Sequence, residues 1–455
     1  MSENTGSIPR NPSLMMAFIR QIWNSLKLPL LAILTAFVLG AILILITSGS
    51  LTTLIQAYEG MIRGAIFKQR GFSESLIATI PYILLSLAVA VGFKSGLFNI
   101  GAEGQFYIGA IGAAYAGVAF NGLPAIVLLP LSLLVGAIGG AIWAGIAGLL
   151  KAKTGAHEVI TTMMMNYISF RLAEFLVSGP LRDPAAGLIQ TRSVSLQAEL
   201  WTLFSIPERL QDPLNALAVA ILMAVLVSLL ARWFVRSSKD ARFTRLSTRR
   251  LVYLGSGLVA GVIFFFLLPA FTKIWWPFND LADRMHIGLF LALGMAVLVW
   301  WFMQHTTIGF ELRTVGANPN AAKYAGINIT RNILVAMGIS GGLAGLAGTI
   351  EVLGVSSCRC LPLFFSSGYG WDSIGIALLA RNDPFGIIAS SFLWGAMRNG
   401  SDLMELSSGV SKYIISLIQA LVLLFVAAPV VVRWIYRLKG DKPTSATPLT
   451  RGWGG

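Results

Sequence analysis

Three polar residues that could bind a small molecule lie within one glycine-rich run of this chain. The run Gly96–Gly112, GLFNIGAEGQFYIGAIG, contains Asn99, Glu103 and Gln105. Amide and carboxylate groups inside a bilayer persist only where protein or a water-filled path satisfies their hydrogen bonds. The run therefore favours a broken helix that faces a translocation path. Tight packing between helices through the glycines is the alternative.

Side chains that could do catalysis are too few and too scattered to predict a catalytic centre. The chain contains no Gly-Lys dipeptide, so it lacks the phosphate-binding loop of an ATPase. Its histidines, His157, His286 and His305, show neither a His-Glu-x-x-His pair nor metal-ligand spacing. Cys358 and Cys360 could be a thiol site or half a metal site, but we interpret them as two small residues of a loop. We therefore expect no enzyme activity, no metal and no cofactor.

The stretch Thr306–Ile327 is a polar interruption between two apolar runs, and it predicts a short capped helix outside the bilayer. Asn318 can accept hydrogen bonds from the first turn, Pro319 fits the first helical position, and Gly326 can take the left-handed conformation that ends a helix. A helix of about seven residues is marginal alone in water, so it needs a surface to dock on. The predicted docking face and its charged edge consist of Ala321, Ala322, Ala325, Tyr324, Glu311, Arg313 and Lys323. A solvated loop is the alternative.

The composition excludes an ordinary soluble domain. Hydrophobic residues make up 56% of the chain and charged residues 12%, and the mean hydropathy is +0.74. The formal charge of +14 gathers in alternate connecting loops, above all in 236–250, as expected where Lys and Arg stay on the cytoplasmic side. The basic balance is therefore a topology signal, and we expect no binding to nucleic acid.

Repeated apolar runs predict an all-α polytopic membrane protein with about twelve crossings, because each run matches the ~30 Å core of a bilayer. The runs lie at about 29–47, 73–92, 102–119, 124–150, 158–177, 214–235, 251–270, 285–303, 331–352, 368–382, 384–399 and 412–435. Starting inside, twelve crossings place 236–250, 304–330 and both termini in the cytoplasm. We interpret the first run as a retained anchor rather than a cleaved signal peptide.

A weaker echo of the glycine-rich region occurs in Ser367–Gly386, which holds Trp371 and Asp372. In the twelve-crossing arrangement, 102–119 runs outward and 368–382 runs inward. Matched segments of opposite direction are what an inverted repeat requires, and such repeats place the transport path at their interface.

The run Gly309–Ile327, GFELRTVGANPNAAKYAGI, resembles the cytoplasmic coupling loop of permeases in the ribose and branched-chain amino acid group of ABC importers, most closely the nucleoside-type permeases. The glycine-rich run and the loop 178–191 resemble the same family. The resemblance implies that an ABC ATPase subunit receives this loop through Glu311, Arg313, Gly316, Asn318, Ala321, Ala322, Tyr324 and Gly326. It also implies a translocation path near Asn99, Glu103, Gln105, Trp371 and Asp372.

The resemblance covers most of 73–191 and 285–435 and implies a ten-helix core with inverted repeats. Between 209 and 284 the chain departs from it, because two extra apolar runs and a basic turn intervene. We interpret this segment as an inserted hairpin of open role. The predicted organisation is a cytoplasmic segment 1–28, a first half 29–208, the hairpin 209–284, a second half 285–436 with the coupling loop 304–330, and a cytoplasmic tail 437–455.

These observations predict the permease subunit of an ABC importer in the cell membrane, forming half of a path for nucleosides or a related sugar-containing solute. The expected partners are an ABC ATPase, a second permease and an extracytoplasmic substrate-binding lipoprotein. The second permease is expected to be a paralogue, with a second copy of this chain as the alternative. The rival class is a secondary transporter coupled to an ion gradient, for which Glu103, Glu174 and Asp372 are the candidate groups. Ribose-like sugars and autoinducer-type molecules remain open as solutes.

Overall fold

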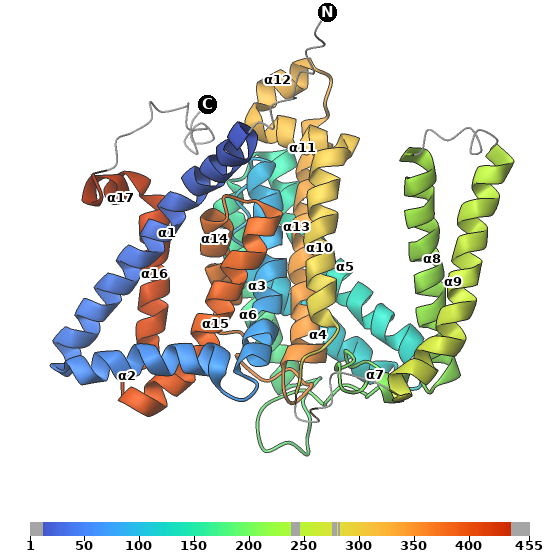
Figure 1. Cartoon of the computed structure of the whole chain (residues 1–455), viewed down its shortest axis with the longest axis horizontal. Helices are drawn as coiled ribbons and strands as arrows, with labels where there is room; N and C mark the ends of the chain where they lie inside the picture. Colours follow the sequence, from blue (N-terminus) through green and yellow to red (C-terminus); the bar gives the residue numbers. More distant parts are fainter. Residues whose placement is uncertain (1–11, 238–245, 275–279, 281–282, 438–455) are drawn as a thin grey trace, which may run out of the picture.

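The computed structural model describes residues 12–237, 246–274, 280 and 283–437, and its elements are helices joined by loops (Figure 1). In chain order they are α1 (Pro12–Ser48), α2 (Leu51–Ile62), η1 (Arg63–Phe67), α3 (Gly71–Lys94), α4 (Ala102–Ala119), α5 (Ala125–Thr154), α6 (Glu158–Ser178), α7 (Ile206–Arg209), α8 (Pro213–Ser237), α9 (Leu246–Ile274), α10 (Gly288–His305), α11 (Thr307–Ala317), α12 (Pro319–Tyr324), α13 (Ile329–Ile350), η3 (Glu351–Val355), α14 (Tyr369–Leu379), α15 (Pro384–Ser408), α16 (Tyr413–Ala427) and α17 (Pro429–Ile435). The elements η1 and η3 are π-helices.

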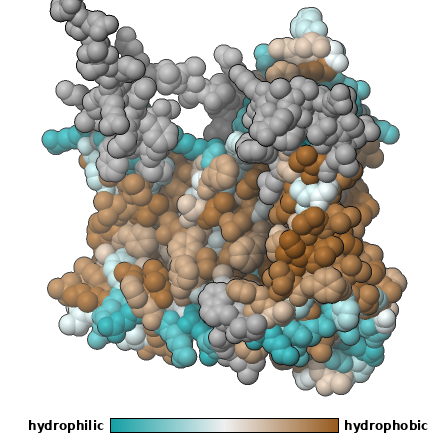
Figure 2. Space-filling model, turned by 45° about the vertical axis from the view of Figure 1, so that its right-hand side comes forward, coloured by the Kyte–Doolittle hydropathy of each residue, from teal (hydrophilic) through white to brown (hydrophobic). Residues whose placement is uncertain are grey.

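The molecule has two distinct ends. At one end, called here the α12 end, lie α11, α12, α17, the start of α1 and the facing ends of α8 and α9 (Figure 1). At the other, called here the loop end, lie α2, α7 and the loops 179–212 and 356–368. An apolar belt lies between two more polar rims in Figure 2. Much of the basic turn 236–250 and of the two terminal segments lies outside the described residues.

Every predicted apolar run corresponds to a helix, but the number twelve is not confirmed. Six described helices are long and apolar enough to cross a membrane, and α16 and α17, bent by 92°, make a seventh if they count as one span. The predicted crossing 368–382 is α14, whose 11 residues reach only about 16 Å. Helix α14 therefore covers about half of a bilayer.

The core is built on glycines that let three helices approach closely. Helix α13 packs against α3, α4 and α5. A Cβ atom added to Gly140 of α5 would lie 2.7 Å from the Cα atom of Gly345 in α13, which real side chains do not tolerate. Small residues at such crossings allow the van der Waals packing that holds helices together in lipid. The glycines of α13 thus place this helix at the centre of the bundle.

The predicted inserted hairpin is α8 and α9, which pack mainly against each other. They touch the rest of the described chain chiefly through α5 and α7, near the loop end (Figure 1). The outward side chains along both helices are apolar and exposed, for example Leu222 and Phe266. The hairpin therefore stands beside the core rather than within it.

One local expectation was wrong. Cys358 and Cys360 were interpreted as two small residues of a loop, but they form a disulfide at the loop end. Their pairing closes a tight turn in the loop that follows η3.

Candidate functional site

The predicted capped helix exists and projects from the α12 end. The Asn318 side chain accepts hydrogen bonds from the backbone N–H groups of residues 320 and 321 at 3.0 and 3.1 Å, and Pro319 opens α12. Gly326 has a φ of +78°, the left-handed conformation that was expected after the helix. The sequence therefore determines this short helix through its caps.

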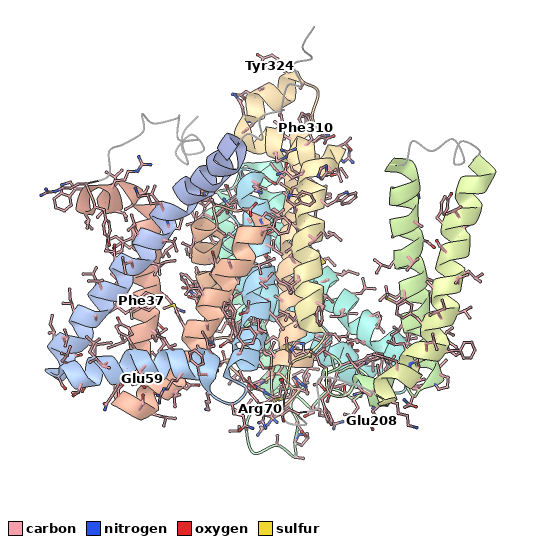
Figure 3. The ribbon with its side chains drawn as sticks, in the orientation of Figure 1. Phe37, Glu59, Arg70, Glu208, Phe310 and Tyr324 are labelled. Carbon is pink, nitrogen blue, oxygen red and sulfur yellow. A yellow bond between two sulfur atoms is a disulfide. The ribbon has the colours of Figure 1, made fainter. Side chains whose placement is uncertain are left out.

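Two aromatic side chains are exposed around α12. Tyr324 is 94% exposed and Phe310, on α11, is 59% exposed, and both lie at the α12 end in Figure 3. Ala321 is exposed as predicted, but Ala322 is fully buried and supports α12 from beneath. Exposed aromatic rings with a polar tip are typical of protein contact surfaces.

Helix α11, which the sequence analysis did not predict, holds α12 in place. The Thr306 hydroxyl caps it by accepting from the Gly309 N–H at 3.0 Å, and Leu312 and Val315 are buried beneath it. The Glu311 carboxylate accepts a 3.0 Å hydrogen bond from the Asn332 side chain on α13. Glu311 therefore attaches α11 to α13.

Gly316 and Arg313 lie on the inner side of this segment. A Cβ atom at Gly316 would lie 2.7 Å from the Gly96 backbone nitrogen, so the glycine lets α11 rest on the loop that follows α3. The Arg313 side chain is half-buried, and its Nε has no hydrogen-bond partner among the described residues. Gly316 thus positions α11, which leads into α12, and the role of both residues in coupling stays a prediction.

Helices α4 and α14 start side by side and run in opposite directions. Gly117, near the end of α4, approaches Val194 of the 179–212 loop at the loop end, whereas the turn after α14 leads to Phe385, which contacts Trp300 near the α12 end. Matched segments of opposite direction were expected from the inverted-repeat pattern.

The Glu103 carboxylate joins the starts of these two helices. It accepts hydrogen bonds from the Gly370 backbone N–H and from the Ser366 hydroxyl. A helix start carries unpaired N–H groups and a partial positive charge, which stabilise a carboxylate. A Cβ atom at Gly370 would lie 2.5 Å from the Glu103 backbone nitrogen, so only glycine allows this approach. The Glu103 carboxylate thus lies at the positive ends of both helices.

Asn99 and Gln105 form a closed hydrogen-bonded pair instead of facing an open path. Their side-chain amides donate to one another at 2.9 Å in both directions. Asn99 also donates to the Ser340 hydroxyl at 2.8 Å, and its carbonyl oxygen accepts from the Gly101 N–H. Both side chains are buried. In this conformation they brace the break between α3 and α4 against α13.

Asp372 belongs to a chain of polar groups that the sequence did not reveal. The Tyr82 hydroxyl donates to its carboxylate at 3.0 Å, and Arg398 donates to the Tyr82 hydroxyl at 2.9 Å. The Arg398 guanidinium also lies 4.2 Å from the ring centroid of Tyr369, a cation–π contact. Trp371, which was predicted beside Asp372 on the path, is 39% exposed.

Arg398 was missed because it ends the apolar run 384–399 and therefore resembles an ordinary terminating charge. The structure continues α15 to Ser408, which leaves Arg398 in the interior of the helix. An arginine that interrupts an otherwise continuous helical pattern is the sequence signal that identifies it.

Aromatic rings surround the junction of α4 and α14. The ring centroids of Tyr82 and Tyr369 are 4.8 Å apart, those of Phe106 and Tyr369 are 5.8 Å apart, and those of Phe106 and Phe365 are 5.2 Å apart. Such pairs add to the stability given by burial alone. The junction therefore combines flat aromatic faces with hydrogen-bonding side chains, a combination suited to a solute with an aromatic ring and polar groups.

Ion pairs fasten α3 to the segment before α10 at the loop end. Arg284 binds the Glu74 carboxylate with two hydrogen bonds of 3.1 and 2.5 Å, and Arg70 binds Asp280 at 2.8 Å. The hydrogen bond to Glu74 raises the pKa of Arg284. Bidentate pairs of this kind hold their geometry better than single contacts do.

His286, next to this ion-paired segment, predicts a pH dependence of stability. Burial lowers the pKa of His286 to about 3, and the charges of Arg359 and Arg284 act in the same direction. An unfolded histidine titrates near 6.5, so between about pH 6.5 and 3 the unfolded chain binds a proton that the folded chain refuses. We therefore expect the free energy of unfolding to decrease as the pH is lowered through that window, by about 1.4 kcal/mol per pH unit.

The variant His286→Asn tests this dependence because an asparagine oxygen can accept the 3.1 Å hydrogen bond that Gly288 N–H donates to the imidazole. We expect the thermal midpoint of the wild type to drop by more than that of the variant between pH 7.5 and 5.0. His305→Asn, at the other end of α10, is the control and should behave as the wild type. An equal drop in the wild type and His286→Asn contradicts the prediction.

The described residues contain no group of three or more His, Cys, Asp or Glu side chains that could hold a metal ion. The arrangement instead offers hydrogen bonds and aromatic faces in the interior and a protruding contact surface at one end.

Comparison with known proteins agrees with this arrangement. The model of a family described as "Branched-chain amino acid transport system / permease component" matches residues 71–262 and 244–427. A guanosine ABC transporter permease protein of Bacillus subtilis is 32% identical over 414 residues, covering 90% of this chain and 96% of its own. A nucleoside ABC transporter permease protein of Lactococcus lactis is 28% identical over 92% of this chain and 95% of its own. A glucose ABC transporter permease protein of Haloferax volcanii is 29% identical, over 89% and 87%. No solved structure matches the chain.

Proposed function

The chain belongs to the family of permease components of branched-chain amino acid transport systems, and we propose that it serves an ATP-driven importer of nucleosides. The observation that carries the proposal is the capped helix α12 with its exposed Tyr324, held at one end of a multi-pass membrane protein. An aromatic ring exposed on so short a helix stabilises nothing in this chain, and it contributes binding energy only where a partner buries it. The partner in this proposal is an ABC ATPase subunit, which hydrolyses the ATP.

Two relatives support the nucleoside assignment. Both match nearly the whole chain, and their names specify guanosine and nucleoside transport. The aromatic rings and polar groups at the junction of α4 and α14 suit a base joined to a sugar. The glucose permease relative keeps a sugar as the second candidate solute.

The orientation follows from the same proposal. In this proposal the α12 end faces the cytoplasm, where the ATPase is. The loop end faces outward and receives a substrate-binding protein. The Cys358–Cys360 disulfide lies at the loop end, which supports the assignment because disulfides persist in oxidising compartments.

The proposed mechanism uses the two halves of the chain, 29–208 and 285–436. ATP-driven closure of the ATPase pair moves α12 and, through Glu311, also α13. The path lies near the starts of α4 and α14, between Glu103 and Asp372, and a second permease subunit supplies its other half. The hairpin 209–284 stands outside this path.

Copurification tests the proposed assembly. We expect the chain, purified from its native membrane in mild detergent, to retain an ABC ATPase and a second permease in constant ratio, identified by mass spectrometry. Uptake of radiolabelled guanosine and uridine by cells that carry the complete system then tests the solute, with labelled glucose as the comparison. A chain that stays alone in several detergents contradicts the proposal and favours a secondary transporter.

A further inference from the structure

Glu351 is a buried carboxylate with an unsatisfied oxygen. The residue is 8% exposed, and its Oε2 atom has no hydrogen-bond partner among the described residues. It is the first residue of the π-helix η3, which continues α13. Leaving a buried polar oxygen unpaired costs free energy, and short π-helical segments within helices occur frequently at functional sites. The unpaired oxygen therefore indicates that this side chain has a role other than packing.

Glu351 lies beside the aromatic junction of α4 and α14. The π-helix η3 packs against α3 and α4, and Gly348, one turn before Glu351, contacts Phe106, whose ring centroid is 5.8 Å from that of Tyr369. The positive Arg398 guanidinium, which stacks on Tyr369, disfavours a metal ion or an ammonium group in this region, because like charges repel. Neutral hydroxyl groups are the donors that remain suitable.

Arg398 also has hydrogen-bonding capacity to spare. A guanidinium carries five N–H donors, and among the described residues Arg398 uses a single hydrogen bond, to Tyr82. The rest of its contact is with the face of Tyr369. A flexible arginine side chain can leave an aromatic face when another flat group takes its place.

We propose that Glu351, Arg398, Tyr82 and Tyr369 form a subsite that binds the ribose hydroxyls and the base of a nucleoside on its way through the path. The solute's adjacent hydroxyls donate to the Glu351 carboxylate, and Arg398 donates to the sugar oxygens. The planar base lies on the Tyr369 ring in place of the guanidinium. This inference rests on the proposed function and adds that the permease itself, not only a binding protein, selects solutes with sugar hydroxyls.

Uptake of a nucleoside and of its 2′,3′-dideoxy analogue tests the subsite. We expect Glu351→Gln to lower kcat/KM for uridine by about 10- to 100-fold, the loss typical of a hydrogen bond to a charged group, and that for 2′,3′-dideoxyuridine by less than twofold. Selection by the binding protein is the same in the wild type and the variant, so the change in their ratio isolates the permease. Glu174→Gln, which loses a surface ion pair with Arg171, is the matched control and should leave the ratio unchanged.

A parallel loss for both solutes, or no loss for either, overturns the inference. If Glu351→Gln does not assemble, Arg398→Lys gives the same comparison, because lysine keeps the charge and loses the planar fork. If neither variant assembles, the pair is structural and the inference fails. Wild-type uptake separates this outcome from the proposed function: a wild-type system that transports glucose and no nucleoside refutes the nucleoside assignment, whatever the variants do.

Discussion

Replacing Tyr324 by alanine is expected to reduce transport by roughly 30-fold or more while leaving the amount of folded permease unchanged. The ring is 94% exposed, so it contributes almost nothing to the stability of its own chain. A buried aromatic anchor in an interface commonly contributes 2 kcal/mol or more to binding, which corresponds to about 30-fold in affinity. The measurement is uptake together with the quantity of ATPase that copurifies.

The control for this variant is Tyr413→Ala, a tyrosine of 76% exposure at the start of α16, far from α12 in the fold. It should retain both uptake and ATPase. Phe310→Ala is expected to weaken copurification in the same direction as Tyr324→Ala, because both rings lie at the α12 end (Figure 3). A Tyr324→Ala protein that transports and copurifies as the wild type does would show that this helix is not the contact surface.

Replacing Glu103 by alanine is expected to destabilise the protein by about 3 kcal/mol and to abolish transport. The carboxylate accepts from Gly370 N–H and from the Ser366 hydroxyl, and its removal leaves the buried Gly370 N–H and the half-buried Ser366 hydroxyl without this acceptor. Each unpaired buried polar group costs about 1–3 kcal/mol. Glu103→Gln keeps one acceptor oxygen and should lose less stability. Thermal midpoints in detergent and uptake in cells measure the two effects.

Glu174→Ala is the comparison for this variant, because Glu174 is a carboxylate of α6 whose Arg171 partner lies at the surface. Exposed ion pairs contribute about 0–1 kcal/mol, so its midpoint should stay near that of the wild type. Equal midpoints for Glu103→Ala and Glu174→Ala would mean that the carboxylate does not join α4 to α14.

Local sequence signals predicted the elements that depend on neighbouring residues. The caps of α12 are the clearest case, because Asn318, Pro319 and Gly326 act on atoms within a few residues of themselves. Apolar runs predicted the positions of the long helices for the same reason. Helix α11 was missed because Gly309 and Gly316 are poor helix formers, and contacts with α10 and with the loop after α3 compensate for them.

The interior contacts could not be predicted from local patterns because their partners are distant in sequence. Asn99 reaches Ser340, 241 residues away, and Arg398 reaches Tyr82, 316 residues away. A polar residue in an apolar run indicates that a partner exists but does not identify it. The half-length of α14 was likewise hidden, since one residue alone separates its run, 368–382, from the next apolar run, 384–399.

Helix α13 links the two functional regions as one stiff rod. It starts beside α11, spans about 33 Å over its 22 residues, and is followed at once by Glu351. Its glycine contacts with α5 leave no room to bend independently. In the proposed assembly, solute at one tip and the ATPase at the other therefore act on a single body. Thermodynamic linkage then requires reciprocity: by whatever factor nucleotide changes the affinity for solute, solute changes the affinity for nucleotide by the same factor.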